Sequence, residues 1–283
     1  MKKLEGKVAF ITGAARGQGR AHSVRLAEEG AKIVAIDICR QMERVTYEMS
    51  SADDLAQTVI DVEAVGGEIM AEAVDVRDLP GLERIAGAAV ERFGSIDIVI
   101  ANAGISTYGR TWELTEELWQ DTIDVNLTAV WKTVKATVPV MIALGRGGSI
   151  VFTSSSAAFV AIPTLSHYTA AKTGLVGLAR SLAQELGEHF IRVNTIHPAA
   201  VETMLALNDN CLRLFAPNIE NPTKEDVRAP FASMNVLPVP WMEPRDVSNT
   251  ILWLVSDDAR FVTGAAIPID MGLSTKYPTA LAE

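Results

Sequence analysis

Tyr168 and Lys172 lie four residues apart at the start of a helical pattern, so both side chains fall on one face of a helix. A free tyrosine titrates near pH 10, whereas a proton donor or acceptor works best closer to neutrality. A neighbouring ammonium favours the phenolate, and a tyrosine pKa lower by about two to three corresponds to roughly 3 to 4 kcal/mol. The pair therefore predicts proton transfer at an alcohol or carbonyl oxygen.

Ser155 stands thirteen residues before Tyr168, at the end of a predicted strand. In a doubly wound sheet, ligands bind at the carboxyl edge of the strands, where a serine hydroxyl can hold a substrate oxygen against the tyrosine. Ser154 and Ser156 flank it. The alternative interpretation is that the three serines simply end the strand.

Asn126 follows Asp124 and Val125 within a long predicted helix. An amide at that depth is either a packed core residue or the holder of a water that links Lys172 to solvent. The sequence leaves both interpretations open.

A glycine-rich turn lies between the first predicted strand and the helix that follows it. It contains Gly13, Arg16, Gly17, Gln18 and Gly19. Glycines at these positions allow a tight turn and a close approach of the backbone to a pyrophosphate, whose charge then lies at the N-terminus of the helix. The turn therefore predicts a dinucleotide site.

Asp37 ends the second predicted strand, roughly 20 residues beyond the glycines, where a carboxylate can accept hydrogen bonds from the adenosine ribose. A 2′-phosphate would meet an anion there. Arg16 is a contrary signal, because a basic residue beside the turn could hold that phosphate. Like charges in a partly desolvated pocket repel strongly, so we expect NAD as the cofactor.

Further residues after the second, third and fourth strands are candidate cofactor contacts: Ile38, Asp75, Val76, Asn102, Ala103 and Gly104. The pair after the third strand would bind the adenine edge. The three after the fourth strand would keep the backbone clear of the cofactor. Both segments also fit ordinary turns.

Short β-branched runs alternate with longer helical patterns along the whole chain, which is typical of a parallel sheet covered on both faces. The predicted strands are residues 7–11, 32–36, 68–74, 96–101, 149–153, 192–196 and 266–269. The predicted helices are residues 19–29, 53–65, 82–93, 116–144, 168–186 and 245–255. This order predicts an α/β, doubly wound Rossmann fold with a seven-stranded parallel sheet, in a single domain over residues 1–283.

Two stretches break this rhythm. Residues 38–52 form an insertion between the second strand and its helix, where a connection is normally a few residues long. Residues 203–243 contain five prolines, and loops of such length are usually active-site lids or disordered segments. We expect the first stretch near the cofactor and the second over the substrate.

The composition excludes several classes of function. The chain of 283 residues is 48% hydrophobic and carries a net charge of −10, which would repel nucleic acid. Cys39 and Cys211 have no spacing typical of a zinc site, so no metal is expected. The first apolar stretch is too short for a signal peptide, and no segment approaches the roughly 20 apolar residues that span a bilayer. We expect a cytoplasmic protein without a membrane partner.

Together these motifs resemble the short-chain dehydrogenase/reductase family, and the resemblance covers essentially the whole chain. It rests on residues 12–19, Asn102-Ala103-Gly104, Asn126, Ser155, Tyr168 and Lys172. The resemblance implies a catalytic tetrad of Asn126, Ser155, Tyr168 and Lys172. It implies that Tyr168 and Lys172 also contact the cofactor, where the lysine holds the nicotinamide ribose. It also implies a homotetramer with residues 116–144 and 168–186 at the interface.

The same family carries a Pro-Gly-x-Val-x-Thr segment that contacts the nicotinamide. Here the segment reads Pro198-Ala199-Ala200-Val201-Glu202-Thr203, with Ala199 in place of the glycine. The resemblance implies cofactor contacts from Pro198, Val201 and Thr203, the last of them to the carboxamide.

The insertion is similar to a narrower branch, the mycofactocin-associated dehydrogenases that include carveol dehydrogenase-like enzymes. This likeness rests on Asp37-Ile38-Cys39, Tyr47, Asp53-Asp54-Leu55, Thr58-Val59 and Val62-Glu63. It implies that the extra loop covers the adenosine end of NAD, that the cofactor stays bound between turnovers, and that an external redox carrier reoxidises it. The alternative is a surface excursion without consequence.

The stretch after Thr203 is rich in leucine, methionine and aromatic residues, which would suit a lipophilic alcohol such as a terpenoid. These side chains could instead face the core or a subunit contact. We expect hydride transfer between a lipophilic, carveol-like secondary alcohol and NAD. The alternatives are a carbonyl reductase that exchanges free NAD(P)H and a non-catalytic dinucleotide-binding sensor.

Overall fold

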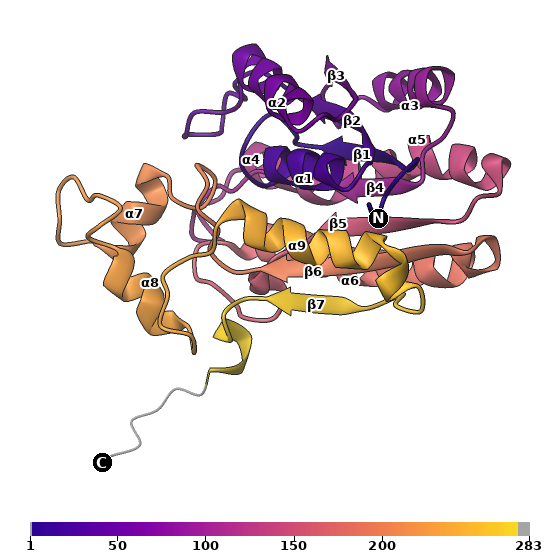
Figure 1. Cartoon of the computed structure of the whole chain (residues 1–283). Coiled ribbons are helices and arrows are strands. Elements are labelled where there is room, and N and C mark those ends of the chain that lie inside the picture. Colours follow the sequence, from indigo (N-terminus) through magenta and orange to yellow (C-terminus); the bar gives the residue numbers. More distant parts are fainter. Residues whose placement is uncertain (1, 277–283) are drawn as a thin grey trace.

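A parallel sheet of seven strands forms the centre of the computed structural model, which describes residues 2–276 (Figure 1). The strands are β1 (Val8–Thr12), β2 (Lys32–Asp37), β3 (Ile69–Ala73), β4 (Ile98–Ala101), β5 (Gly148–Thr153), β6 (Ile191–Pro198) and β7 (Ala266–Ile269). Their order across the sheet is β3-β2-β1-β4-β5-β6-β7. The order in which strands are added reverses at β1, because β2 and β3 lie on one side of it and β4 lies on the other. A crevice for ligands is therefore expected at the carboxyl ends of β1 and β4. The predicted seven-stranded α/β fold is confirmed.

Helices cover both faces of the sheet. The helices of the described residues are α1 (Gly17–Glu28), α2 (Ala52–Ala64), α3 (Leu79–Phe93), α4 (Glu116–Ile123), α5 (Ala129–Leu144), α6 (Ser166–Leu186), α7 (Asp209–Phe215), α8 (Arg228–Met234) and α9 (Pro244–Val255), of which α7 and α8 lie beyond the ends of the strands. The predicted helices and strands are confirmed, with ends that differ by up to three residues. Within the long predicted helix, a π-helical turn (Asp124–Thr128) joins α4 to α5, a feature that often marks a functional site.

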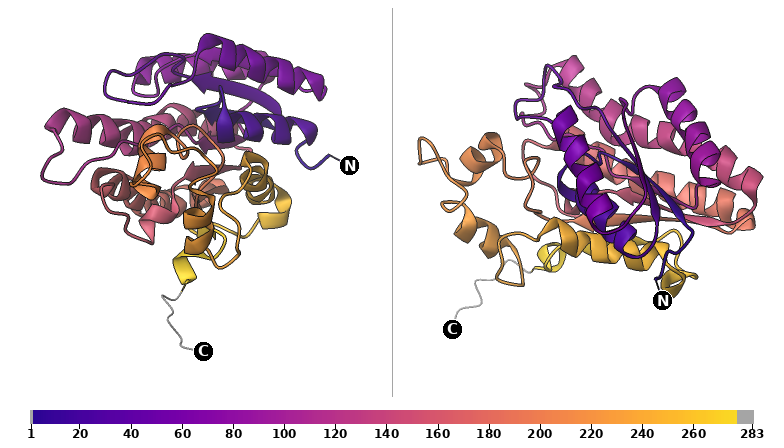
Figure 2. Two further views of the ribbon diagram at one scale, coloured as in Figure 1. Left: turned by 90° about the vertical axis from the view of Figure 1, so that its left-hand side faces the viewer. Right: turned by 45° about the horizontal axis from the view of Figure 1, so that its top comes forward.

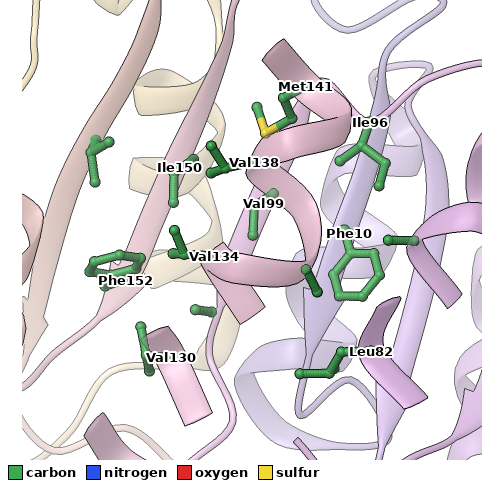
Figure 3. Packing of buried hydrophobic residues seen from close by; sticks show 14 of the residues in the cluster. Phe10, Leu82, Ile96, Val99, Val130, Val134, Val138, Met141, Ile150 and Phe152 are labelled. Carbon is green, nitrogen blue, oxygen red and sulfur yellow. The ribbon is translucent and has the colours of Figure 1, made fainter. Parts of the chain in front are cut away.

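Successive side chains of each strand point to opposite faces of the sheet, and this gives the molecule two apolar cores. Val8 and Phe10 of β1 pack with the face covered by α3, α5 and α6, which Figure 3 shows around Phe10 and Phe152. Ala9 and Ile11 of the same strand pack with the face covered by α1, α2 and α9. Because both faces are buried, the strands are continuous apolar runs, and apolar residues do not alternate with polar ones.

The two irregular stretches lie at the carboxyl edge of the sheet. The insertion (residues 38–52) follows β2, and the lid (residues 203–243) follows β6 and contains α7 and α8. Figures 1 and 2 show these two helices beyond the ends of the strands. Neither helix produces a clear hydrophobic period in the sequence, because each spans only seven residues and prolines separate them.

The continuous helix from Glu116 to Leu144 is, among residues 2–276, long and apolar enough by length and composition to cross a membrane. Val130, Val134 and Met141 of this helix belong to the core beside the sheet (Figure 3). It therefore packs as a core helix, and it provides no argument for a membrane location.

Candidate active site

The turn after β1 and the loop after β4 approach each other closely at the crevice. Gly13 has a φ of +67°, and a Cβ at this position would lie 2.8 Å from the Cα of Ala103. A Cβ at Gly19 would lie 2.0 Å from the carbonyl oxygen of Gly13. Both positions therefore exclude a side chain, and the start of α1 lies against the edge of the sheet, where its free N–H groups can bind an anion.

Hydrogen bonds hold the loop after β4 in place. The Oγ1 atom of Thr12 accepts from the backbone N–H groups of Asn102 and Ala103, both at 3.0 Å. The side-chain amide of Asn102 donates to the carbonyl oxygen of Thr12 at 3.1 Å. The segment from Asn102 to Gly104 is thus a fixed wall of the crevice rather than a free turn.

The crevice at this edge has a volume of about 350 Å³. The predicted cofactor contacts that line it are Gly13, Arg16, Gly17, Gln18, Asp37, Ile38, Asp75, Val76, Asn102, Ala103, Gly104 and Thr203. The predicted contacts that lie outside this lining are Gly19, Tyr168, Lys172, Pro198 and Val201. Residues that the sequence analysis does not name as cofactor contacts also line it, namely Met42, Tyr47, Met49, Ser50, Ile105, Val125, Glu202, Met204 and Leu205.

The carboxylate of Asp37 is fixed at the wall of the crevice. It accepts hydrogen bonds from the backbone N–H of Ala15 at 2.9 Å and from the hydroxyl of Ser50 at 2.5 Å. Its residue is only 6% exposed. A second anion placed against this carboxylate would be repelled with little screening by water.

Arg16 contributes to the contact between the turn and the insertion. Its guanidinium donates to the backbone carbonyl oxygen of Glu48. One N–H group of the arginine is therefore engaged with the insertion. This weakens the argument that Arg16 is available to bind the 2′-phosphate of NADP.

Asp75 lines the crevice, but arginines engage its carboxylate. Arg77 donates to it at 2.7 Å and Arg40 at 3.1 Å. Burial alone would raise the pKa of Asp75, yet the hydrogen bonds and charge of Arg77 lower it overall. Any adenine contact here would therefore involve the backbone of Asp75 and Val76 more readily than the carboxylate.

The insertion is packed against the rest of the site. Met42, Val45 and Tyr47 form an apolar cluster with Ile105 and Val125, which belong to the loop after β4 and to the π-helical turn. This cluster argues against the interpretation of the insertion as a surface excursion.

Two polar contacts extend the attachment of the insertion. Arg44 forms an ion pair with Asp121 of α4 at 3.0 Å. The side-chain amide of Asn210, in the lid, donates to the hydroxyl of Thr46 at 2.6 Å. The insertion thus contacts the lid and α4 as well as the loop after β4.

Tyr168 and Lys172 lie together in the first turns of α6. The Nζ atom of Lys172 lies 5.6 Å from the centroid of the tyrosine ring and donates to the carbonyl oxygen of Thr153 at 2.9 Å. Burial lowers the pKa of Lys172 to about 8. Burial also raises the pKa of Tyr168 to about 12, against the opposite effect of Ser155. The expected lowering of the tyrosine pKa is therefore wrong, because desolvation outweighs the opposite effect of Ser155.

The three serines after β5 make different contacts. Ser155 lies close enough to Tyr168 to act on its pKa in the lowering direction, and its Oγ atom accepts from the N–H of Ala157 at 3.1 Å. Ser154 instead donates to the backbone carbonyl of Lys172 at 2.8 Å. Ser155 is thus the serine directed at the tyrosine, while Ser154 ties the end of β5 to α6.

Asn126 is fully buried in the π-helical turn, and its side chain hydrogen bonds with backbone groups. It donates to the carbonyl oxygens of Ile105 at 2.9 Å and Thr122 at 3.0 Å, and it accepts from the N–H of Ile105 at 3.2 Å. A Cβ at Gly104 would lie 2.8 Å from its Oδ1 and 3.4 Å from the Nζ of Lys172. Asn126 therefore stands close to Lys172, with Gly104 between them.

The segment after β6 reaches the glycine turn. A Cβ at Gly17 would lie 3.1 Å from the Cγ2 atom of Thr203. Val201 is buried and pairs with Met242 at the far end of the lid. Glu202 accepts from the side-chain N–H of Trp241 at 3.1 Å. The segment is therefore tied to the far end of the lid as well as to the glycine turn.

The lid has a small apolar core of its own. It contains Cys211, Leu212, Ala216, Val227 and Phe231, with Tyr108, Phe215 and Trp241 packed against it. These side chains stabilise the lid internally, whereas Met204 and Leu205 line the crevice. The packing of these side chains agrees with the interpretation that part of the apolar stretch faces a core, and their contact with a lipophilic substrate stays a prediction.

Comparison with known proteins agrees with this geometry. A family model described as enoyl-(acyl carrier protein) reductase matches residues 13–274. A (−)-trans-carveol dehydrogenase of Rhodococcus erythropolis is 48% identical over 277 residues, which cover 98% of this chain and 100% of that protein.

Two solved structures are also similar. A carveol dehydrogenase of Mycobacterium avium in complex with NAD has a TM-score of 0.95 and 48% identity, with 98% of this chain and 100% of that chain covered. A short chain dehydrogenase of Mycobacterium paratuberculosis bound to NAD has a TM-score of 0.87 and 42% identity, with 97% and 100% covered.

Proposed function

The chain belongs to the short-chain dehydrogenase/reductase family, and from this premise we propose that it is an NAD-dependent dehydrogenase of a lipophilic, carveol-like secondary alcohol. The observation that carries the proposal is the grouping of Ser155, Tyr168 and Lys172 at the carboxyl edge of the sheet, where Ser155 acts to lower the pKa of Tyr168 and the Nζ atom of Lys172 lies 5.6 Å from the centroid of the tyrosine ring. The carveol dehydrogenase relatives support the class of alcohol. A sensor without chemistry would need none of these three side chains.

The crevice fits NAD. Two glycine positions remove side chains where a pyrophosphate would approach, and the carboxylate of Asp37 stands at the end of β2, where a ribose hydroxyl can donate to it. Asn102 and Thr203 line the same crevice. The NAD-bound structural relatives support this assignment.

In the proposed reaction, Tyr168 is the catalytic base. Its oxygen takes the hydroxyl proton of the alcohol, which Ser155 holds by a hydrogen bond. Because burial raises the pKa of Tyr168 to about 12, the tyrosine acts as this base through the fraction that is phenolate, and that fraction grows as the pH rises. NAD, when bound, supplies the acceptor for the hydrogen and the two electrons that leave the carbinol carbon. Lys172 stabilises the phenolate by its positive charge, and Asn126 supports the backbone beside that lysine. The product is a ketone.

Carbonyl reduction with exchange of free NAD(P)H is the second candidate. A Tyr168 pKa of about 12 keeps the phenol protonated at neutral pH, which suits the donation of a proton to a carbonyl oxygen. The same residues would then run the reaction in reverse.

The insertion and the lid are assigned separate parts of this function. The insertion is proposed to cover the adenosine end of NAD and to retain it between turnovers, so that an external redox carrier reoxidises it. Its contacts with Asp37, Asp121 and Asn210 support this role. The lid is proposed to close over the substrate.

We further propose a cytoplasmic homotetramer that uses the helices of residues 116–144 and 168–186. Trp119 and Trp131 of the first region are 39% and 44% exposed, which is unusual for such large apolar side chains and supports an interface there. Light scattering on the purified protein measures the number of subunits.

The decisive experiment is to incubate purified protein with terpene alcohols, with and without added NAD or an artificial electron acceptor. Turnover that needs the electron acceptor and ignores added NAD supports a retained cofactor. Turnover that needs added NAD supports an exchanging dehydrogenase. Absence of alcohol-dependent reduction in every condition would overturn the proposed function.

A further inference from the structure

His197 is a fully buried histidine near the end of β6, and its ring bridges two polar groups. The Nδ1 atom lies 3.0 Å from the backbone carbonyl oxygen of Ser155. The Nε2 atom lies 2.7 Å from the hydroxyl oxygen of Thr195. A side chain of a neighbouring strand thus binds the backbone of the serine that contacts Tyr168.

These contacts identify the tautomer. The carbonyl oxygen of Ser155 can only accept, so the proton must be on Nδ1 of His197. The Nε2 atom of the neutral ring then accepts from the hydroxyl of Thr195. Burial lowers the pKa of His197, which agrees with a neutral ring.

The hydrogen bond between His197 and the Ser155 carbonyl stands where the pairing of β5 with β6 has already ended. The register of β5 and β6 pairs Thr153 with Ile196, and the N–H of Ser154 makes a further bond with the carbonyl of Ile196 at 2.8 Å. Ser155 lies beyond this ladder. Its carbonyl accepts from the N–H of Ala158 at 3.0 Å, within its own turn, so His197 supplies the connection to the sheet.

An aromatic stack holds the histidine ring in its plane. The ring of Phe159 stacks on it with centroids 4.3 Å apart and an angle of 29°. Phe159 follows the short 3-10 turn that Ser155 begins. Both ends of this turn are therefore attached to the same imidazole.

We propose that His197 is a positioning residue that fixes the backbone of Ser155 and thereby directs the serine hydroxyl at Tyr168 and the substrate oxygen. The inference rests on the proposed alcohol oxidation. It assigns no direct chemistry to the imidazole, whose two nitrogen atoms are both engaged with the protein.

The test compares His197→Leu with His197→Asn. Leucine removes the donor, whereas the amide nitrogen of asparagine is attached to the same Cγ and can donate to the Ser155 carbonyl. His22→Leu is the matched control, since His22 is also fully buried but bonds with Ser248, between α1 and α9. The measured quantities are kcat with a terpene alcohol, KM, NAD affinity and melting temperature.

We expect His197→Leu to lower kcat by at least about tenfold with NAD affinity unchanged, because small displacements of a positioning group are costly. His197→Asn should recover most of the loss, and His22→Leu should lower the melting temperature without this loss of kcat. A folded His197→Leu with wild-type kcat, or an asparagine variant as slow as the leucine variant, would overturn the proposal.

A crystal structure of His197→Leu decides the inference even if wild-type protein oxidises no alcohol. In that case the proposed function fails, while the position of Ser155 can still be measured. A displaced or disordered Ser155 turn supports the positioning role. An unmoved Ser155 carbonyl and hydroxyl overturn it.

Discussion

The hydroxyl of Ser50 donates a hydrogen bond to the carboxylate of Asp37 at 2.5 Å. Asp37 ends β2 and Ser50 lies at the far end of the insertion, so the loop closes on the carboxylate from which it departs. The bond holds a negative charge at the wall of the crevice. Cofactor choice and the attachment of the insertion therefore depend on the same side chain.

Asp37→Asn should reduce the preference for NAD over NADP by about tenfold, because the amide removes the charge that repels a 2′-phosphate. Asparagine keeps an oxygen that accepts from Ala15. Titration of each cofactor against the purified variant measures the change. Asp75→Asn is the control, since Arg77 already pairs with that carboxylate, and a similar change in the control would contradict the assignment.

Tyr168→Phe should lower turnover by about 10² to 10⁴, the usual contribution of a general acid or base. NAD affinity should stay within about twofold, because the phenol does not line the cofactor crevice. Steady-state rates and a binding titration measure the two effects. A variant that keeps near-normal turnover would remove Tyr168 from the mechanism.

The alternation of strands and helices was predictable from the sequence because the pattern of apolar residues reflects which faces of each strand and helix are buried. Strands such as residues 8–12 and 32–37 are apolar on both faces, and this pattern indicates a covered parallel sheet. The glycine turn and the pair Tyr168 and Lys172 could be placed because local spacing determines which side chains share a helix face or a turn.

Long-range contacts within the site could not be predicted in the same way. The sequence places Arg16 in the glycine turn, but the contact with Glu48 depends on how the insertion folds back. The Tyr168 pKa depends on burial, which no local spacing reveals. His197 was overlooked, although a histidine in the apolar strand Ile191–Pro198 is the kind of buried polar residue that needs partners.

Lys172 should make folding stability increase with pH. Burial lowers its folded pKa to about 8, below its usual value of 10.5, so between these values the unfolded chain binds a proton that the folded chain has released. The cost of the buried ammonium is fully present below about pH 8 and is relieved as the pH rises. Relative to Lys172→Met, the wild type should gain about 2 kcal/mol between about pH 7.5 and 9.5.

Urea unfolding of both proteins at the two pH values measures this difference. Tyr168 ionises above the window, so its raised pKa does not interfere. A difference between the proteins that is independent of pH would show that Lys172 titrates normally.

Tyr47→Ala should loosen the insertion, which we propose covers the adenosine end of the cofactor. Tyr47 is 8% exposed, packs with Ile105 and Val125, and accepts from the N–H of Ser106 at 3.3 Å. Truncating a buried aromatic side chain costs about 3 to 5 kcal/mol in a core, so even part of this loss should raise the NAD dissociation rate by tenfold or more.

Release of bound cofactor into excess free NAD measures the rate. Ile60→Ala, on the exposed side of α2, is the control and should leave it unchanged. Equal rates in wild type and Tyr47→Ala would mean that the insertion does not retain the cofactor.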